Sequence, residues 1–414
     1  MAKDAIITGL DVGSTTIRVA VGQRNYQDNE VHIIGAAEHP AEGISKGVVT
    51  SIEDAIASIS GALEKVERMT GIPVEQAYVS INGSHVISQE SHGVVAVSKA
   101  DGEIKEDDVA RAIEAAQTVA TPPNYEILHV IPRQFTVDNQ KGIKDPVGMT
   151  GIKLEVDTQI ILGLSSQVKN LTKCIYRTGV DIQDLVVGVL ASSESVLSRR
   201  QKELGVALVN LGGLTTSIMV FEEGDVIYTK ILPVGSGHIT NDIAIGLRTS
   251  VEMAEKIKAE HGTALPSEVG KKDEIDLAQM DGGEEGLVSK KEVAEIIEAR
   301  VEEIYNLINK ELKNIDRAGM LPAGIVLTGG GAKLHGMVDV AKKVFCLPAS
   351  VGVPKDFKTA IDKINDPVFA TAVGLVMWGA NLEQNNKKGS FIPKFSSVMD
   401  VTGNMKKWFK SLLP

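Results

Sequence analysis

Two turns in this chain carry the residue types that bind phosphate groups. The first follows an apolar stretch and contains Asp11, Gly13, Ser14, Thr15 and Thr16. The second lies about half a chain length further on and contains Asn210, Gly212, Gly213 and Thr215. Glycines let backbone N–H groups approach anionic oxygens, and hydroxyl groups add further donors. One such turn alone fits a simple tight hairpin equally well, but the near-repeat favours a phosphate site and a duplicated domain.

Asp11 is a candidate metal ligand at this site. It follows the apolar residues 5–10, where its carboxylate can bind Mg²⁺ through water, because that ion keeps much of its hydration shell. No Gly-Lys-Ser/Thr follows either turn, so neither is a P-loop. A third segment runs from the strand-like residues 325–327 into Gly329, Gly330 and Gly331 and then a predicted helix. Its bare backbone allows close approach of a ribose or purine, and a helix N-terminus favours phosphate.

Short apolar stretches must position these turns. Residues 5–10 and 17–21 predict a strand hairpin around the first turn, and residues 206–211 and 218–221 predict one around the second. Periodicity predicts further strands and helices between and after them. The predicted strands are 31–37, 77–81 and 185–189, and the predicted helices are 51–68, 168–177, 191–204 and 366–380. Residues 246–323 predict a charged, mainly helical region with a loop at 271–286 and a long helix at 289–315.

The stretch from residue 86 to 163 interrupts this alternation. Strand-like runs at 94–97, 127–137 and 159–162 flank one predicted helix at 106–117. We therefore predict a small α+β insert in the first half of the chain.

The composition narrows the class of protein. The 414 residues are 43% apolar, which is enough for two large domains with buried cores. The formal net charge of −11 argues against broad nucleic-acid binding. The only cysteines are Cys174 and Cys346, which excludes a disulfide framework or zinc cluster and fits a reducing cytosol. No apolar run is long enough to span a bilayer, so we expect any membrane contact to be peripheral.

The last residues predict an amphipathic helix after a polar linker. Met405, Trp408, Phe409, Leu412 and Leu413 fall on one helical face, flanked by Lys406, Lys407 and Lys410. An apolar face with aromatic residues and flanking lysines is typical of a helix that lies in a membrane interface. Docking on the protein's own core, or on a partner protein, are the alternative interpretations.

The order of the three glycine segments resembles the actin and DnaK-chaperone ATPase superfamily. Residues 78–85, 235–244 and 369–375 resemble, within it, the FtsA family of cell-division proteins. The insert stands where that family carries its own extra subdomain in place of an actin subdomain. With the terminal helix, the resemblance covers essentially the whole chain. It implies an α/β, actin-like (ribonuclease H-like) two-lobed ATPase fold with an FtsA-type inserted α+β subdomain and a C-terminal amphipathic helix.

The resemblance also implies how the chain divides. The first lobe comprises residues 1–85 and 164–205 and carries the insert at 86–163. The second lobe comprises residues 206–245 and 324–381 and carries the helical subdomain at 246–323. A flexible linker at 382–399 and a membrane-targeting helix at 400–414 follow.

By this resemblance, ATP and Mg²⁺ bind between the lobes. The implied contacts are the phosphate-turn and triple-glycine residues named above, together with Gly235 and Lys333. Glu255 and Lys258 match the helix that clamps the adenosine in bacterial actins, and their spacing puts both on one helical face. An ordinary surface ion pair is the alternative interpretation of these two residues.

The resemblance implies a structural adaptor in bacterial cell division. It implies filaments of the protein itself, docking of the FtsZ C-terminal tail, contact with anionic membrane lipid, and recruitment of other division proteins by the insert. Arg300, Glu303 and Asn306 match the family's FtsZ-docking surface, although a solvated helix face fits them nearly as well. The implied location is the cytoplasmic face of the cell membrane at the division septum.

Two positions depart from relatives that hydrolyse ATP. Asn210 stands where such proteins usually have Asp, so a charge that organises Mg²⁺ and water is missing. Gly188 lies where bacterial actins tend to carry a Glu or Gln that positions the attacking water, and Glu194 is the nearest carboxylate. Because phosphoryl transfer to water needs an oriented nucleophile, we expect tight ATP binding with slow or absent hydrolysis.

Two other functions are compatible with this fold. One is a sugar or acid kinase, but no catalytic base is evident and a kinase needs no membrane helix. The other is the related type IV pilus assembly ATPase. The terminal helix after a long linker favours the FtsA family over it.

Overall fold

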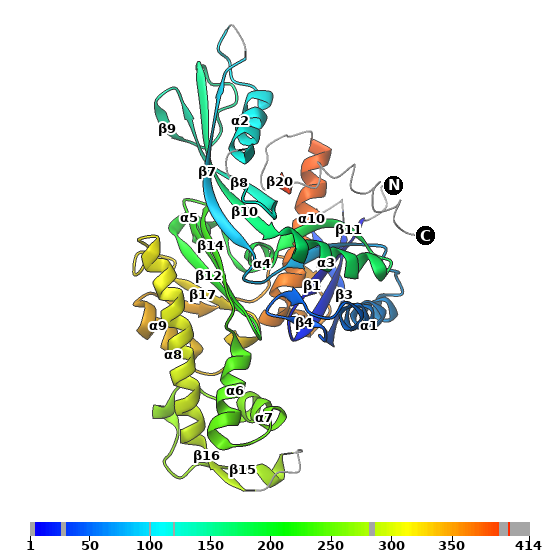
Figure 1. Ribbon diagram of the computed structural model, residues 1–414, viewed down its shortest axis with the longest axis vertical. Coiled ribbons are helices and arrows are strands. Elements are labelled where there is room, and N and C mark those ends of the chain that lie inside the picture. Colours follow the sequence, from blue (N-terminus) through cyan, green and yellow to red (C-terminus); the bar gives the residue numbers. More distant parts are fainter. Residues whose placement is uncertain are drawn as a thin grey trace.

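The protein is elongated, with a different unit at each end. The computed structural model describes residues 5–25, 30–98, 101–118, 121–280, 286–388 and 396–397. The insert lies at one end of the long axis, two sheets lie side by side in the middle, and a helical subdomain forms the other end (Figure 1).

The two central sheets share one strand order. Each has three antiparallel strands in succession, and the first strand of this meander continues into two parallel strands on its other side. This shared order agrees with the duplication that the two phosphate turns predict. The first sheet consists of β1 (Ala5–Val12), β2 (Thr16–Arg24), β3 (Val31–Pro40), β6 (Gln76–Ile81), β11 (Asp181–Val187) and the short β19 (Lys358–Thr359). The second consists of β12 (Val206–Leu211), β13 (Thr216–Glu222), β14 (Asp225–Leu232), β17 (Ile325–Thr328) and β18 (Ala349–Val351).

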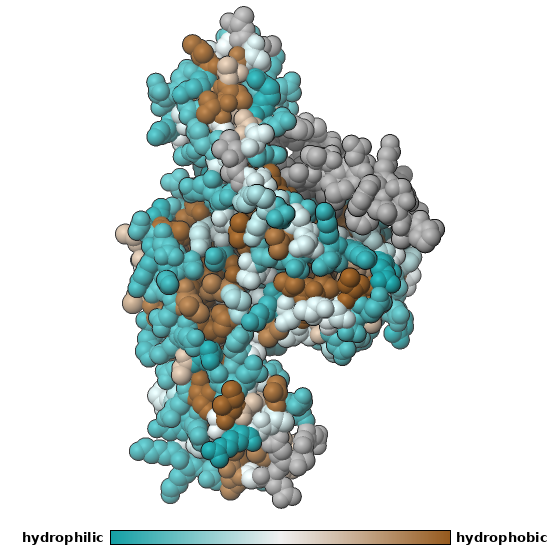
Figure 2. All heavy atoms as spheres, viewed as in Figure 1, coloured by the Kyte–Doolittle hydropathy of each residue, from teal (hydrophilic) through white to brown (hydrophobic). Residues whose placement is uncertain are grey.

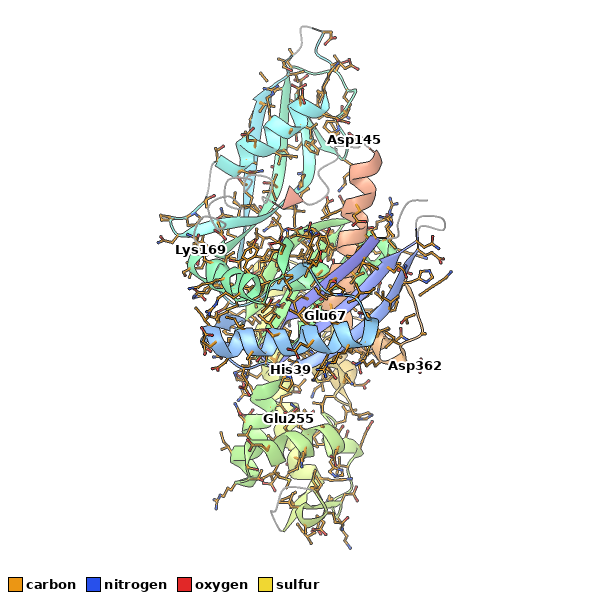
Figure 3. The ribbon with its side chains drawn as sticks, turned by 90° about the vertical axis from the view of Figure 1, so that its right-hand side faces the viewer. His39, Glu67, Asp145, Lys169, Glu255 and Asp362 are labelled. Carbon is orange, nitrogen blue, oxygen red and sulfur yellow. The ribbon has the colours of Figure 1, made fainter. Side chains whose placement is uncertain are left out.

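Helices cover both faces of the first sheet, so its inner strands are buried almost throughout. The helices α1 (Ile52–Thr70) and α3 (Ser165–Arg177) pack on one face with the small hairpin of β4 (Ile44–Ser45) and β5 (Val48–Val49). Figure 3 shows α1 lying across this face, with Glu67 near its end. The helix α10 (Ala370–Lys388), preceded by the turn η5 (Pro367–Phe369), covers the other face.

The contact between α10 and the first sheet is very close. A Cβ atom on Gly9 would lie 2.3 Å from the carbonyl oxygen of Ala372, so β1 has no room for a side chain there. Around this contact, side chains of the sheet, of η5 and of α10 form one buried cluster that includes Ile7, Ile33, Phe369 and Val376. The first lobe is therefore completed by residues from near the end of the chain.

A second helix, α4 (Gly188–Val196), lies against α10 near the junction of the lobes. A Cβ atom on Gly374 would lie 1.9 Å from the carbonyl oxygen of Ala191, so the two helices touch backbone to backbone. The Ser195 hydroxyl also donates to the carbonyl oxygen of Ala370 at 2.7 Å. These contacts fix α4 and α10 relative to each other.

The insert is an antiparallel sheet with one helix and its own core. It consists of β7 (Ile87–Ala96), α2 (Glu106–Thr118), β8 (Tyr125–Val137), β9 (Gln140–Ile143) and β10 (Lys153–Leu164). His129 of β8 is fully buried against Trp378 and accepts a hydrogen bond from the backbone N–H of Val187, which directly precedes α4. Burial lowers the pKa of His129 to about 3, so this link to the first lobe is neutral.

The insert also contacts the second lobe. The Ser88 hydroxyl donates to the carbonyl oxygen of Thr229 at 2.8 Å, and Lys144 forms an ion pair with Asp225. The insert therefore spans both lobes on the side remote from the helical subdomain.

The helical subdomain is inserted between strands β14 and β17 of the second sheet. It consists of α6 (Ser236–Leu247), α7 (Val251–His261), α8 (Lys290–Asn314) and the strand pair β15 (Glu274–Asp276) and β16 (Leu287–Ser289), and α9 (Met337–Phe345) packs against α8. Apolar side chains remain exposed at this end and on the insert, as the brown atoms at both ends of Figure 2 show. They are Ile245, Val251, Leu287 and Leu307 at this end, and Val94, Val147 and Ile152 on the insert.

Four sequence predictions need correction. The helix predicted at 191–204 is two helices, α4 and α5 (Arg199–Leu204), because Ser198 is extended and forms a capping box with Gln201. The loop predicted at 271–286 contains β15, which pairs with β16. The helix predicted directly after the triple glycine is a short turn, η3 (Gly330–Lys333), and α9 begins only at Met337.

The fourth correction concerns the predicted linker at 382–399. Its start is helical, since α10 runs on to Lys388, and Ser396–Ser397 pair with β8 as the short strand β20. Residues 389–395 and 398–414, which include the predicted terminal helix, lie outside the described residues. Among the helices that the structure describes, none has the length and apolarity needed to cross a bilayer.

The backbone contact between α4 and α10 makes a testable prediction. Gly374→Ala would force the helices apart and should destabilise the protein by about 1–3 kcal/mol through overpacking. Thermal unfolding measures this effect. Gly246→Ala on α6 is the matched control, because the new methyl group would meet only the flexible end of Ile296 and should leave the melting temperature equal or slightly higher. Equal melting of both variants would contradict the prediction.

Candidate functional site

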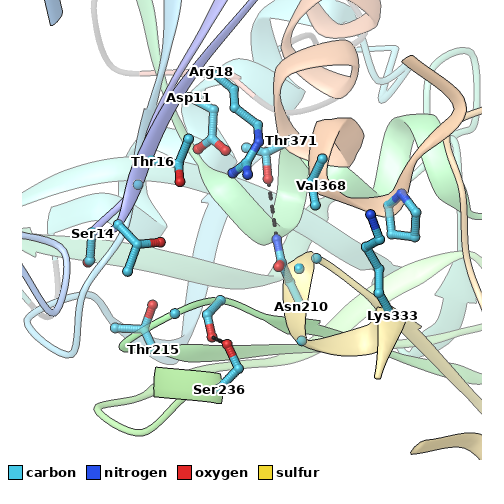
Figure 4. A pocket seen from close by; sticks show the side chains of 18 of the residues that line it. Asp11, Ser14, Thr16, Arg18, Asn210, Thr215, Ser236, Lys333, Val368 and Thr371 are labelled. Atoms are coloured by element: carbon cyan, nitrogen blue, oxygen red, sulfur yellow. Dashed lines mark hydrogen bonds between the residues drawn. The ribbon is translucent and has the colours of Figure 1, made fainter. Parts of the chain in front are cut away.

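A polar cavity of about 490 Å³ lies between the two lobes. Figure 4 shows Asp11, Thr16 and Arg18 on one side and Thr215 and Ser236 across from them. Nearly all of the residues that the sequence predicts to bind nucleotide line this cavity. They are Asp11, Gly13, Ser14, Thr15, Thr16, Asn210, Gly212, Gly213, Thr215, Glu255, Lys258, Gly329, Gly330, Gly331 and Lys333.

Gly235 is the exception among the predicted site residues. It does not line the cavity but precedes α6, beneath the second phosphate turn. A Cβ atom there would lie 2.5 Å from the carbonyl oxygen of Gly212 and 2.7 Å from that of Gly213. Gly235 therefore allows α6 to start directly under the turn.

The two phosphate turns face each other at close range. A Cβ atom on Gly213 would lie 2.4 Å from the Thr15 methyl carbon, so the turns of the two lobes nearly touch. A Cβ atom on Gly13 would lie 2.4 Å from the carbonyl oxygen of Thr16. Glycine is therefore required at both positions, and the backbone N–H groups of such turns are suited to donate to an anion.

Asp11 ends β1 at the wall of the cavity and is buried. The Ser80 hydroxyl donates to its carboxylate at 2.8 Å, and that hydroxyl accepts in turn from the backbone N–H of Val12 at 2.9 Å. Burial raises the pKa of the Asp11 carboxyl above its ordinary value, and the Ser80 hydrogen bond and the Arg18 charge oppose this only in part. A buried carboxylate at a polar cavity is suited to bind a cation.

Arg18 is a site residue that the sequence prediction missed. In the β1–β2 hairpin it is paired directly with Asp11, so its guanidinium lines the same cavity. Its Cζ atom also lies 5.9 Å from the centre of the Phe369 ring. The signal was available, because a predicted hairpin around the first turn brings these two positions opposite each other.

Glu255 and Lys258 lie on α7 and face α6. The Lys258 amine donates to the Glu255 carboxylate at 2.6 Å and to the Thr240 hydroxyl at 2.7 Å. Lys258 is only 11% exposed, whereas Glu255 is 56% exposed. The ion pair is therefore part of the cavity wall, with the Glu255 carboxylate accessible from the solvent.

The triple-glycine segment closes the cavity on the side of the second lobe. Gly329 has a φ of +83°, and a Cβ atom there would lie 2.3 Å from the amide oxygen of Asn210. Lys333 projects into this region and forms an ion pair with Asp366. Position 329 therefore requires glycine, and the Lys333 side chain brings a positive charge to this part of the cavity.

Gly188 and Glu194, which bear on hydrolysis, lie in α4 without offering a carboxylate to the cavity. Gly188 is the first residue of α4, and the Asn82 amide fills the place where a side chain on Gly188 would lie. Glu194 points elsewhere and forms an ion pair with Lys202 at 2.7 Å. Asn82 lines the cavity, so the side chain that stands in the place of one on Gly188 is a neutral amide.

Within the described residues, no group of three or more His, Cys, Asp or Glu side chains is placed to hold a metal ion. A cation bound by Asp11 can take further ligands from water and from a bound anion. This fits Mg²⁺, which is usually held by one or two carboxylates and substrate phosphates.

The predicted partner-binding residues lie on α8, away from the cavity. Arg300 forms hydrogen bonds with Asp242 of α6 at 2.5 and 2.9 Å and with Glu303 at 2.7 Å. Arg300 thus joins the two helices, while Glu303 and Asn306 are exposed. The predicted membrane residues, from Met405 to Leu413, lie outside the described residues.

Two family models match this chain. The model described as cell division protein FtsA matches residues 207–374, and the model of the SHS2 domain inserted in FtsA matches residues 83–162. The second match covers the insert between β6 and α3.

Curated relatives match over nearly the full length. The cell division protein FtsA of Pseudomonas aeruginosa is 35% identical over 407 residues, which is 97% of each chain. That of Bacillus subtilis is 38% identical over 402 residues, which is 97% of this chain and 90% of the relative.

Solved structures match the fold at lower identity. A chain of the PilM–PilN type IV pilus biogenesis complex has a TM-score of 0.66 at 14% identity, covering 90% of this chain and 98% of that one. MreB5 of Spiroplasma citri bound to ADP has a TM-score of 0.54 at 14% identity, covering 93% of this chain and 99% of that one. Together with the matched models, they confirm the predicted actin-like fold with its inserted subdomain.

The buried Asp11 carboxyl makes a prediction for the protein without ligand. Because its pKa is raised on folding, protonation favours the folded state, and this contribution is lost as the pH rises through the folded-state pKa. Asn keeps an oxygen that can accept from Ser80 but carries no charge. Asp11→Asn should therefore raise the melting temperature at pH 7, and the gain should shrink as the pH falls toward the ordinary pKa of 3.8. A gain that is the same at both ends of this range would contradict the prediction.

Proposed function

This chain belongs to the FtsA family of cell division proteins, and we propose that in division it links the FtsZ ring to the membrane as an ATP-binding adaptor. The observation that carries the proposal is the cavity, in which both glycine turns, Asp11 and the Glu255–Lys258 pair converge. The adaptor acts at the cytoplasmic face of the division septum and forms filaments of its own.

ATP with Mg²⁺ fits the residues of the cavity. The glycine turns offer backbone N–H groups to the phosphates, and Arg18 and Lys333 add positive charge. Asp11 would hold Mg²⁺ through water, and α7 would contact the adenosine through Glu255 and Lys258. Support also comes from the related fold of MreB5, whose structures are described as bound to ADP and to AMPPNP.

Hydrolysis should be slow or absent. Attack by water needs a group that orients it, and beside Gly188 the cavity wall carries the neutral Asn82 amide. The Glu194 carboxylate forms an ion pair with Lys202. Asn210 has no charge with which to organise Mg²⁺ and water. In this proposal ATP acts mainly as a bound ligand.

The competing functions fit less well. A kinase would need a catalytic base that faces the cavity, and Asp11 is the only carboxylate of the described cavity wall besides Glu255. The type IV pilus complex resembles this chain at 14% identity, which supports a shared fold and no more. The family membership favours the division adaptor over both.

The FtsZ tail would dock on the helical subdomain beside α8. Glu303 and Asn306 are exposed there, and Leu307 next to them exposes apolar surface. Arg300 would contribute chiefly by joining α8 to Asp242 of α6, because its guanidinium is already bonded to two carboxylates. Tails in this family carry basic and apolar residues, which suit an acidic surface with an apolar centre.

The membrane contact would come from the terminal amphipathic helix. Its apolar face would enter the interface of the bilayer, and Lys406, Lys407 and Lys410 would attract anionic lipid. One short helix binds reversibly, so filaments would strengthen the attachment by multivalency. The insert, with exposed apolar residues such as Ile152, would recruit other division proteins.

The ATP site is tested by comparing affinities with Mg²⁺ and with EDTA. Wild type should bind ATP more tightly with Mg²⁺, and Asp11→Asn should remove most of this gain, about tenfold or 1.4 kcal/mol. Asp225→Asn is the control, because this carboxyl is partly buried and its pKa is raised like that of Asp11, but it pairs with Lys144 and does not line the cavity. An unchanged effect of Mg²⁺ in the Asp11→Asn protein would count heavily against the site.

The docking surface is tested with an FtsZ tail peptide. Leu307→Lys should weaken peptide binding about tenfold, because it puts a charge of the wrong sign on the apolar centre. Met320→Lys is the control, since Met320 is also exposed but lies beyond the end of α8. Arg300→Glu should also disrupt docking, and its melting temperature must be recorded because the bond to Asp242 is lost. Equal binding by wild type, Leu307→Lys and Arg300→Glu would remove this surface from the proposal.

The membrane helix is tested by co-sedimentation with anionic vesicles. Trp408→Glu should abolish sedimentation while ATP affinity stays the same. In wild type, vesicles should shift the Trp408 fluorescence to the blue, whereas the buried Trp378 should respond little. Replacing Lys406, Lys407 and Lys410 by Ala should weaken binding mainly to anionic lipid. If the Trp408→Glu protein sediments as wild type does, the anchor lies elsewhere.

A further inference from the structure

Asn210 lies at the cavity wall, but its side chain is bonded to two other elements of the protein. It is the penultimate residue of β12, just before the second phosphate turn, and its amide nitrogen lies 3.2 Å from the Ser192 hydroxyl and 3.2 Å from the Thr371 hydroxyl. Figure 4 marks the bond to Thr371. Ser192 belongs to α4 and Thr371 to α10, so one side chain joins the second sheet to both helices.

The two hydroxyl groups require residue 210 to donate hydrogen bonds to them. The Ser192 hydroxyl has a single proton, which it donates to the carbonyl oxygen of Gly188 at 2.8 Å. The Thr371 hydroxyl lies 3.0 Å from the Ser192 oxygen and must therefore be the donor of that bond. Both oxygens then present only lone pairs toward Asn210. An amide NH₂ group, with its two protons, satisfies both of them.

A carboxylate would not satisfy the same partners. Asp has the shape of Asn but offers only acceptor oxygens, so it would face two hydroxyl oxygens whose protons are already committed. To bond with it, Ser192 would have to release Gly188, or Thr371 would have to release Ser192. Both hydroxyls are buried, so such a change would leave polar groups without partners.

The acceptors themselves are held in place. The close contact of Gly374 with Ala191 and the bond from Ser195 to Ala370 fix α4 against α10. Asn210 is thereby bound to a rigid pair of helices, and the turn that follows it, which begins at Gly212, is positioned relative to the first lobe.

We propose that Asn210 is a positioning residue that donates two hydrogen bonds to α4 and α10 and so sets the second phosphate turn for ATP, and that it is not a ligand of the metal ion. This inference rests on the proposed binding of ATP in the cavity. It also gives a reason for Asn at this position that is independent of hydrolysis.

The test measures ATP affinity with Mg²⁺ and with EDTA in single variants. Asn210→Asp should lower the affinity about tenfold in both conditions, so that the ratio of the two affinities stays as in wild type. Ser192→Ala should lower both affinities in the same way, and it is the sharper variant because Ser192 is buried and does not line the cavity. The Asn210→Asp and Ser192→Ala effects should combine to less than their product, because both act on one network.

Matched variants separate this role from general damage. Ser193→Ala removes a neighbouring buried hydroxyl that bonds only to Leu190 of its own helix, and should leave both affinities unchanged. Thr371→Val should behave like Ser192→Ala, and Thr371→Ser, which restores the hydroxyl, should recover the affinity. Circular dichroism of each variant shows whether it is folded.

The outcomes separate a failure of the Asn210 inference from a failure of the ATP site itself. If Asn210→Asp raises the ratio of affinity in Mg²⁺ to affinity in EDTA, residue 210 faces the metal ion and the inference is overturned. A folded Ser192→Ala protein with wild-type affinities would overturn it as well. If wild type itself binds no ATP in either condition, the proposed site fails before the role of Asn210 is tested.

Discussion

The backbone contact between α4 and α10 is the constraint on which the rest of the molecule depends. The chain passes from α4 into the second lobe, and it is back on the first sheet with β19 and then α10, so the two helices lie close to both crossings. Because Gly374 lets them touch, the two helices are fixed relative to each other, and Asn210 of the second sheet is bonded to both. The glycine turns of the two lobes face each other beside this junction, across a cavity of about 490 Å³. The junction thus holds the elements that carry both turns.

The cavity contains a carboxylate whose burial costs free energy and which can bind a cation. Asp11 is buried, and the Ser80 hydrogen bond and the Arg18 charge offset the cost of burying its carboxylate only in part. Such a group favours any ligand that brings a cation with it. The turns opposite contribute backbone donors and glycines instead of charged side chains, so the site attracts an anion and a cation together.

Much of this fold followed from local patterns, because strands, helices and glycine turns have short-range signatures. The prediction of one helix at 191–204 was wrong although Ser198 and Gln201 have the capping-box spacing, since the apolar pattern on both sides hid the break. The fold of the insert was predicted in outline, but β9 was missed because it is short and mostly exposed. The bond between Asn210 and Thr371 could not be predicted, because it joins residues far apart in sequence.

The cover that α10 provides for the first sheet has a consequence for synthesis. Strands β1 to β3 leave the ribosome first, yet the apolar face that holds Ile7 and Ile33 waits for Phe369 and Val376. The second lobe has every strand of its sheet by Val351. A nascent chain can therefore complete its second half before its first, and through most of translation the early strands expose a surface that chaperones recognise or that aggregates.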